Sequence, residues 1–177
     1  MPQPSVIVDL AGPADLPALH ALVESAYRGD AARAGWTHEA DLLQGQRTSL
    51  ESLAAAVADP CERILLLRLD GALAGCVQVS DRGGGRAYLG MLAVDPARQA
   101  GGFGRRLIAE AERLAAETFG ATSIEMTVID RRTELVAYYL RRGYAETGET
   151  RPFPTVTDPP LRFTVLAKAI GAPAPTA

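Results

Sequence analysis

The first half of the chain shows a strand pattern of apolar residues, then a helical pattern. Residues 5–10 alternate weakly and predict a strand. After Gly12-Pro13 the apolar positions recur every three or four residues, which predicts a helix. These positions are Leu16, Leu19, Val23, Ala26 and Tyr27. Residues 28–36 have no period and predict a loop, whereas the Leu- and Ala-rich residues 41–58 predict one or two further helices.

Three apolar runs of strand length follow. Residues 63–69 and 72–80 are joined by Asp70-Gly71, a dipeptide that tolerates the positive φ values of a tight turn. They therefore predict an antiparallel hairpin. Residues 88–94 predict a third strand, which ends at Asp95-Pro96 because proline cannot donate a hydrogen bond to a ladder.

The second half adds two helices with a strand between them. Apolar residues from Leu107 to Thr118 share one helical face, and this helix ends near Gly120. Residues 123–129 predict a strand, and residues 135–140 predict a short amphipathic helix that is capped by Gly143.

Two closing strands complete the pattern, at residues 144–149 and 161–169. The order of elements predicts a single mixed α/β (α+β) domain. Its sheet is expected to have about six or seven mostly antiparallel strands, flanked by helices. We expect residues 1–170 to form this domain and residues 171–177 to form a flexible tail.

The segment from Gln99 to Arg106 lies between the third strand and the next helix. A glycine-containing turn before a helix presents unpaired N–H groups and a positive dipole end, which together bind phosphate. The candidate phosphate-binding residues of this loop are Gln99, Ala100, Gly101, Gly102, Phe103, Gly104 and Arg105.

Two familiar phosphate loops do not fit this segment. A P-loop needs Gly-Lys-Ser/Thr, and the chain has Gly104-Arg105-Arg106 there. A dinucleotide fingerprint needs its first glycine directly after the strand and a third glycine three residues beyond the second. Here residues 95–100 intervene, and Leu107 occupies the place of the third glycine. Nucleotide hydrolysis and dinucleotide binding are therefore disfavoured.

The remaining pattern is Gln/Arg-x-x-Gly-x-Gly/Ala, matched by Gln99, Gly102 and Gly104 after Leu92-Ala93-Val94-Asp95-Pro96. In this the chain resembles the GNAT (Gcn5-related N-acetyltransferase) superfamily, whose pyrophosphate-binding motif has this form. The resemblance implies acetyl-CoA as the acyl donor, and no metal. It also implies a splayed central pair of parallel strands, here residues 88–94 and 123–129, with the pantetheine arm between them. Backbone groups of Leu92, Ala93 and Val94 would pair with that arm.

A second motif strengthens the resemblance. Members of the family carry a Tyr four residues before a Gly that is followed by an aromatic residue, as in Tyr139-Leu140-Arg141-Arg142-Gly143-Tyr144. This Tyr commonly protonates the departing thiolate, so Tyr139 is the candidate general acid and Tyr138 is the rival phenol. One position departs from the family. An Asn often stands seven residues before the Tyr, and this chain has Arg132 instead.

The sequence contains weaker signals for the binding site of the acceptor amine. By resemblance, the candidate acceptor residues are Trp36, Arg47 and Arg151, with Glu125, Glu39 or Asp41 as alternative bases. Arginines and aromatic residues in irregular segments favour a small amine that carries a carboxylate, with solvated arginines as the alternative interpretation. The sequence leaves two other functions open: a catalytically weak coenzyme A-binding regulatory module, and acetylation of a protein or peptide amine.

Composition and charge narrow the partners. The 177 residues carry a formal net charge of −3, which gives no general attraction to nucleic acid or anionic membranes. Cys61 and Cys76 suggest neither a disulfide framework nor a zinc site. No membrane span or signal peptide is predicted, so we expect a cytosolic enzyme with a small-molecule substrate. The resemblance also allows a homodimer.

Overall fold

The computed structural model describes residues 3–28 and 47–171. In this part of the chain seven strands form one sheet in the order β1-β2-β3-β4-β5-β7-β6. Every neighbouring pair is antiparallel except β4 and β5, which are parallel. The strands are β1 (Val6–Leu10), β2 (Glu62–Leu69), β3 (Ala72–Asp81), β4 (Arg86–Val94), β5 (Ser123–Ile129), β6 (Ala145–Pro152) and β7 (Arg162–Ala169).

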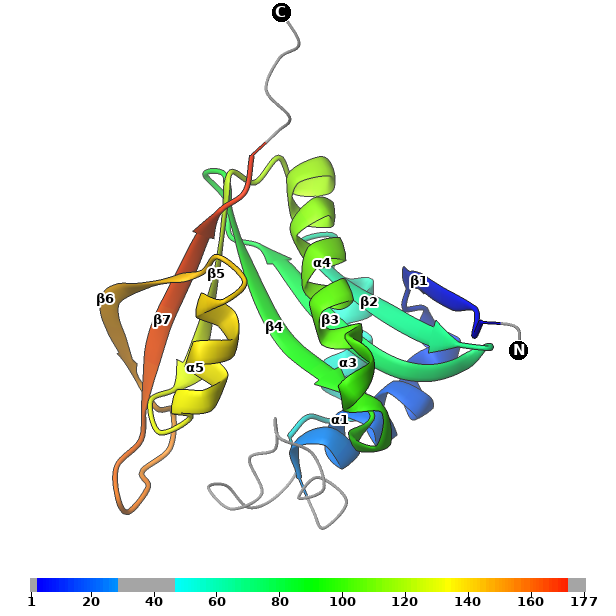
Figure 1. The fold of residues 1–177 in the computed structure, drawn as a ribbon, viewed down its shortest axis with the longest axis horizontal. Coiled ribbons are helices and arrows are strands. Elements are labelled where there is room, and N and C mark those ends of the chain that lie inside the picture. The colour runs from blue at the N-terminus through cyan, green and yellow to red at the C-terminus, as the bar shows by residue number, and fades with distance from the viewer. Residues whose placement is uncertain (1–2, 29–46, 172–177) are drawn as a thin grey trace, which may run out of the picture.

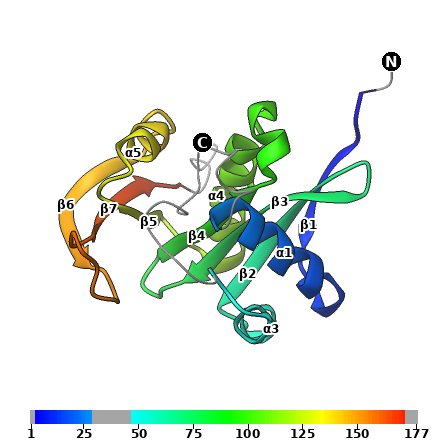
Figure 2. The ribbon, with the colours of Figure 1, turned by 90° about the horizontal axis from the view of Figure 1, so that it is seen from below.

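Helices cover both faces of the sheet (Figure 1, Figure 2). Helices α1 (Leu16–Tyr27) and α3 (Leu50–Ala58) lie on one face, and α4 (Phe103–Phe119) and α5 (Thr133–Leu140) lie on the other. Two short 3-10 helices, Pro13–Asp15 and Pro96–Gly101, precede α1 and α4. This arrangement confirms the predicted mixed fold with its mostly antiparallel sheet.

The two faces bury separate apolar clusters. Leu19 and Leu53 pack with Leu66 beneath α1 and α3, and all three side chains are fully or almost fully buried. Leu107 packs with Ile124 beneath α4. A sheet that is buried on both faces in its centre explains why its central strands read as continuous apolar runs with little alternation.

The predicted hairpin between β2 and β3 is confirmed. Asp70 and Gly71 both have positive φ angles, 48° and 84°, as a two-residue turn that matches the strand twist requires. Gly120 is confirmed as the end of α4, because it caps the helix in the left-handed conformation.

Strands β4 and β5 pair over a short distance and then separate (Figure 1). Arg86, Ala87 and Tyr88 pair with Ser123, Ile124 and Glu125. At the end of this paired stretch the hydroxyls of Tyr88 and Thr127 lie 2.6 Å apart and bridge the two strands where they begin to diverge. Residues 89–94 and 126–129 do not pair with one another. The sheet therefore contains an opening between its central strands, which confirms the predicted splayed pair of parallel strands.

Strand β4 also contains a β-bulge that the sequence did not predict. The register with β3 shifts between Cys76 and Gln78, and Met91 adopts a φ of 50°. Before the bulge, Leu89 faces the α4 side; after it, Leu92 faces that side while Met91 faces α1. An extra residue reverses which face each later side chain points to. The bulge therefore sets the orientation of Leu92 and Val94 at the opening.

Helix α4 begins four residues before Leu107, the first apolar position of the predicted helix. Phe103 is its first residue, so Gly104 and Arg105 lie in the first helical turn and not in the loop. The left-handed Gly102 fixes this start. Part of the predicted segment 41–58 and most of the predicted tail 171–177 lie outside the described residues. No helix in the described ranges is long and apolar enough to cross a membrane.

Candidate active site

The predicted phosphate loop forms a pocket at the N-terminus of α4. Gly102 caps the helix with a φ of 73° and a ψ of 13°, and Arg106 N donates to its carbonyl oxygen at 3.2 Å. The N–H groups of the first helical turn have no acceptor within the helix and point toward this end. The pocket has a volume of about 340 Å³. Its lining includes the predicted residues Leu92, Val94, Gln99, Ala100, Gly102 and Gly104.

The three glycines of this loop are required for two different structural reasons. Gly102 has a left-handed backbone, and a Cβ there would meet open space. A Cβ on Gly104 would lie 2.8 Å from the hydroxyl oxygen of Tyr138, and a Cβ on Gly101 would lie 2.3 Å from the ring of Phe103. Only Gly102 therefore leaves open space beside the backbone, whereas Gly101 and Gly104 admit neighbouring aromatic side chains. Phe103 and Arg105 stand beside these glycines without lining the pocket.

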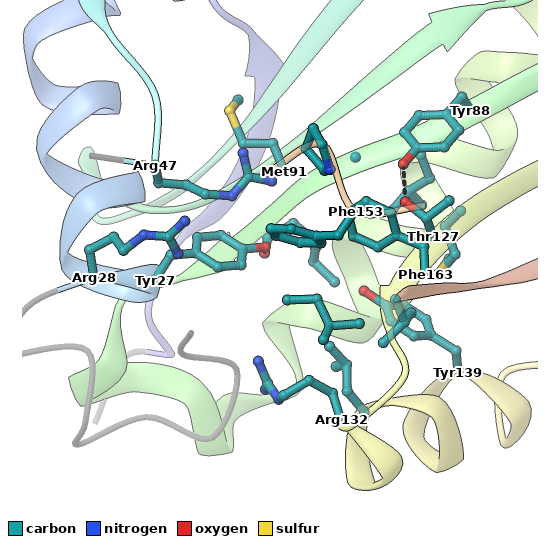
Figure 3. A pocket seen from close by; sticks show the side chains of 18 residues that line it. Tyr27, Arg28, Arg47, Tyr88, Met91, Thr127, Arg132, Tyr139, Phe153 and Phe163 are labelled. Atoms are coloured by element: carbon teal, nitrogen blue, oxygen red, sulfur yellow. Dashed lines mark hydrogen bonds between the residues drawn. The ribbon is translucent and has the colours of Figure 1, made fainter. Parts of the chain in front are cut away.

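A second cavity, of about 370 Å³, occupies the opening between β4 and β5 (Figure 3). Its walls combine backbone and side chains of both strands with residues from α1, α5 and the β6–β7 connection. Leu92 lines this cavity and the loop pocket alike. An elongated ligand with its phosphates at the loop could therefore extend along β4 into the opening of the sheet.

Tyr139 faces this cavity from α5 (Figure 3). The residue is only 5% exposed, and in the described part of the chain no side chain or backbone group forms a hydrogen bond with its hydroxyl. Burial raises the pKa of Tyr139 well above its usual value, and the neighbouring phenols Tyr27 and Tyr138 add to that rise. The hydroxyl therefore remains protonated at neutral pH and is available as a donor to a ligand.

The motif around Tyr139 is explained by the end of α5. Gly143 has a φ of 92°, and its N–H donates to Leu140 O at 3.1 Å, while Tyr144 N donates to Tyr139 O at 3.2 Å. These two bonds form a Schellman motif, in which Gly143 is the left-handed residue and a contact between Tyr139 and Tyr144 is expected. The predicted capping role of Gly143 is confirmed.

The rival phenol points elsewhere. Tyr138 lines the loop pocket and lies near Gly104, while the guanidinium carbon of Arg142 stands 3.3 Å from the centre of its ring. Burial raises the pKa of Tyr138, and Arg142 partly opposes that shift. Adjacent residues of one helix thus serve different pockets, with Tyr139 at the opening of the sheet and Tyr138 at the phosphate loop.

The three predicted strand residues, Leu92, Ala93 and Val94, lie along the open edge of β4. The carbonyl oxygen of Leu92 accepts a hydrogen bond from the hydroxyl of Tyr27, and that of Val94 accepts one from Gln99 at 3.3 Å. The side chain of Ala93 packs against the α1 side of the sheet, so only its backbone could serve a ligand in the opening.

The predicted acceptor residues fall into two neighbouring pockets. Arg47 lines the cavity between β4 and β5. Glu125 and Arg151 line the adjacent pocket, where Arg151 pairs with Glu125 at 3.1 Å and with Glu149 at 2.8 Å. The hydrogen bond with Glu149 is the largest cause that raises the pKa of Arg151, and Glu125 adds to that rise. Trp36 and the alternative bases Glu39 and Asp41 lie outside the described residues.

Several cavity residues were not assigned a site role from the sequence. The sequence places Tyr27 on an apolar helix face and Arg28 in a loop, and their spacing carries no sign of the cavity that they line. Arg132 stands where the family often has Asn, and its side chain is 8% exposed and lines the cavity. The bulge at Met91 had a local signal, because the preceding Gly90 is an isolated glycine within a strand.

A pocket at a helix N-terminus and an opening between parallel strands that leads to a buried phenol are the features expected of an acyltransferase that uses a coenzyme A thioester. The match to a family model narrows this class. The model of the acetyltransferase (GNAT) family matches residues 18–144, and the chain belongs to this family. It is therefore an N-acetyltransferase that uses acetyl-CoA. Among the described residues, no group of His, Cys, Asp and Glu side chains could hold a metal ion.

Solved structures with the same fold share little sequence with this chain. The ribosomal-protein-S18-alanine N-acetyltransferase from Escherichia coli has a TM-score of 0.74 at 19% identity, covering 98% of this chain and 99% of that one. A putative phosphinothricin N-acetyltransferase has a TM-score of 0.72 at 19% identity, covering 95% and 100%. The putative acetyltransferase yncA of Salmonella typhimurium, solved with acetyl-CoA, has a TM-score of 0.72 at 15% identity, covering 98% of both chains. A search of curated proteins found no match.

Proposed function

We propose that this enzyme transfers the acetyl group of acetyl-CoA to the primary amine of a small molecule, by direct attack, with Tyr139 as the general acid. The observation that carries the proposal is the position of the Tyr139 hydroxyl. It faces the cavity between β4 and β5, and Leu92 connects that cavity with the phosphate pocket. A thioester that reached this point would lie beside a buried hydrogen-bond donor.

Acetyl-CoA supplies an activated carbonyl carbon that an amine can attack. As the nitrogen lone pair forms the new C–N bond, negative charge builds on the carbonyl oxygen, and a backbone N–H near Leu92 stabilises it. The C–S bond then breaks, its electron pair leaves with sulfur, and the Tyr139 hydroxyl gives its proton to that sulfur. The nitrogen loses one proton to water or to a carboxylate, for which Glu125 in the adjoining pocket is the candidate.

Burial affects both partners in the proton transfer. A thiol in water has a pKa near ~8.5, below that of a phenol, which would make Tyr139 a weak proton donor to a solvated thiolate. A thiolate that leaves inside the same cavity is also desolvated, which raises its proton affinity, whereas the arginines that line the cavity lower it. The proton is proposed to pass within a direct hydrogen bond between the Tyr139 hydroxyl and the departing sulfur.

A small acceptor fits the dimensions of the site. The cavity of about 370 Å³ is walled by Phe153 and Phe163, whose ring centres lie 5.0 Å apart, and it adjoins the pocket of Glu125 and Arg151. This space matches a small molecule better than a folded protein surface. The structurally similar proteins include enzymes named for quite different acceptors, so the fold alone does not choose among amines.

Tyr139→Phe tests the mechanism. Thermal stabilisation by acetyl-CoA should be the same in the variant and the wild type, because the phenol hydroxyl is not needed for binding. The rate of coenzyme A release with a panel of primary amines should fall by about 10²- to 10⁴-fold. Tyr138→Phe tests the rival phenol, and a larger loss of kcat from that variant would transfer the role to Tyr138.

The same measurements separate the alternatives. Equal, slow release of coenzyme A from Tyr139→Phe and wild type with every amine would favour a coenzyme A-binding regulatory module. Rapid acetylation of peptides with little turnover of small amines would favour a protein or peptide acceptor.

A further inference from the structure

Three guanidinium groups line the cavity between β4 and β5, and they come from separate elements. Arg28 follows the last residue of α1, Arg47 precedes α3, and Arg132 is the N-cap of α5. Figure 3 shows Arg28 and Arg47 along one wall and Arg132 across the cavity from them. Among the described lining residues none is Asp, Glu or His. Arginine side chains therefore contribute positive charge to this cavity, and Glu134 offsets part of it because it pairs with Arg132 at 2.9 Å.

Arg47 is held in place by two contacts with α1. One carboxylate oxygen of Glu24 accepts hydrogen bonds from the backbone N–H groups of Arg47, at 2.7 Å, and Thr48, at 2.9 Å. The guanidinium carbon of Arg47 lies 5.1 Å from the ring centre of Tyr27. Contacts to both the backbone and the side chain reduce the entropy that Arg47 would lose on binding a ligand.

Tyr27 connects this arginine to the reacting end of the cavity. Its ring contacts the Arg47 guanidinium, and its hydroxyl donates to the carbonyl oxygen of Leu92 on β4. Leu92 marks the point where the thioester carbonyl is proposed to lie. A group bound by Arg47 would therefore be fixed relative to the acetyl group by a single tyrosine side chain.

We infer, building on the amine acetylation proposed above, that the acceptor is a small amine that also carries a carboxylate, as a free amino acid does, and that Arg47 together with Arg28 binds that carboxylate. Guanidinium groups pair with carboxylates through two parallel hydrogen bonds. The apolar part of the acceptor would contact Phe153 and Phe163. A polyamine, by contrast, would bring further positive charge against these arginines.

The arginines would also assist the reaction. An ammonium group cannot attack a thioester, so the acceptor must lose a proton before or during the transfer. Nearby positive charge disfavours the protonated amine and shifts its equilibrium toward the neutral nucleophile. The same groups that select the carboxylate would thus favour the reactive form of the amine at the other end of the molecule.

The first test compares each amino acid with its own carboxamide. Coenzyme A release is measured with the standard amino acids, their carboxamides, polyamines and short peptides, each with acetyl-CoA. Thermal stabilisation of the coenzyme A-loaded protein by the same compounds is measured in parallel, so binding is scored without turnover. The inference predicts that at least one amino acid is preferred over its carboxamide by about 10- to 100-fold in kcat/KM, or stabilises the loaded protein where its carboxamide does not.

The second test is Arg47→Gln, with Arg113→Gln as the matched control. Arg113 is an exposed residue of α4 that pairs with Glu110 and Glu117, so its replacement removes the same charge far from the cavity. With the preferred amino acid, Arg47→Gln should raise KM by about 10- to 100-fold. With the carboxamide it should change KM by less than about threefold. Arg113→Gln should change neither, and thermal stabilisation by acetyl-CoA should be retained in both variants.

The results separate this inference from the proposed function. If acetyl-CoA bound but no amine accepted its acetyl group, the proposed function would be contradicted, and the binding comparison would still test the carboxylate. Turnover of polyamines, peptides or carboxamides at least as efficient as that of every amino acid would overturn the inference alone. An equal effect of Arg47→Gln on an amino acid and its carboxamide would also overturn it.

Discussion

The ring of Tyr144 packs edge-on against the ring of Tyr139, with their centres 5.8 Å apart and their planes at 72°. The Schellman motif at the end of α5 brings these residues together, because Tyr144 N donates to Tyr139 O. The Tyr144 hydroxyl donates to Glu112 on α4 at 3.0 Å, and Lys168 on β7 pairs with the same carboxylate at 2.9 Å. Tyr139 is thus positioned by a helix cap that is itself anchored to α4 and β7.

This relationship predicts that Tyr144 positions Tyr139 through its ring, with the hydroxyl contributing mainly to stability. Tyr144→Phe should lower the free energy of unfolding by about 1 kcal/mol, the typical value for one hydrogen bond, and should leave kcat within about threefold. Tyr144→Leu removes the aromatic edge and should lower kcat by about 10-fold or more, with the KM for acetyl-CoA little changed. Steady-state kinetics and denaturant unfolding check both variants. A loss of kcat in Tyr144→Phe equal to that in Tyr144→Leu would contradict the positioning role of the ring.

Gly102 provides a second prediction, because it combines a left-handed backbone with open space at the phosphate pocket. Asn tolerates this conformation better than other side chains, so Gly102→Asn should cost only about 1 kcal/mol of stability. Its side chain would occupy open space at a residue that lines the phosphate pocket, and it should raise the KM for acetyl-CoA by about 10-fold or more.

Gly84→Asn is the matched control for this variant. Gly84 has a φ of 61° and equally open surroundings, but it lies in the turn between β3 and β4 and does not line the phosphate pocket. It should have a similar cost in stability and leave the KM for acetyl-CoA unchanged. If both variants affected this KM equally, the loop around Gly102 would not be the phosphate-binding element.

The glycine loop before α4 and the helix cap at Gly143 could be predicted from the sequence because their signals are local. A glycine turn before a helix, and a Tyr four residues before a left-handed Gly, are features of consecutive residues. The cavity wall opposite Tyr139 could not be predicted in this way. Tyr27 and Arg28 reach it from the end of α1, and Tyr27 meets Leu92 across 65 positions of the chain. Only the antiparallel order of the intervening strands brings those residues together.

Strand β4 shows a different limit. Its apolar run predicted a strand correctly, but continuous apolar sequence cannot show which face each side chain occupies when both faces are buried. The bulge at Met91 exchanges those faces and turns Leu92 toward the α4 side. Gly90 was the only local indication of this irregularity.

Glu125 is the residue proposed to act as the general base. It also pairs with Arg151, and mutation can separate these two roles. Glu125→Gln keeps an acceptor for Arg151 but cannot take a proton. If Glu125 removes the proton of the amine, kcat should fall by about 10²-fold near neutral pH and recover partly as pH rises, because more of the amine is then neutral.

Glu149→Gln is the control for the ion pair. Glu149 pairs with the same guanidinium at 2.8 Å, but it is exposed on β6 and does not line the pocket. It should change kcat by less than about threefold. If the two variants had equal kinetics, Glu125 would act only as an ion-pair partner of Arg151, and water would be the proton acceptor.

Cys76 gives a prediction about stability and pH. Burial raises the pKa of this fully buried thiol to about 12, from a value near 9 in a solvated chain. A group whose pKa is higher in the folded state stabilises the fold below its unfolded pKa, and this contribution is lost as pH rises toward the folded pKa. Between pH 8 and pH 10 the free energy of unfolding should therefore fall by about 1.4 kcal/mol because of Cys76 alone. Urea unfolding under reducing conditions measures this loss. Cys76→Ala should remove most of the decrease, whereas Cys61→Ala, at an exposed cysteine, should retain it.

An unchanged pH dependence in Cys76→Ala would show that other groups, such as the buried phenols, account for the alkaline loss of stability.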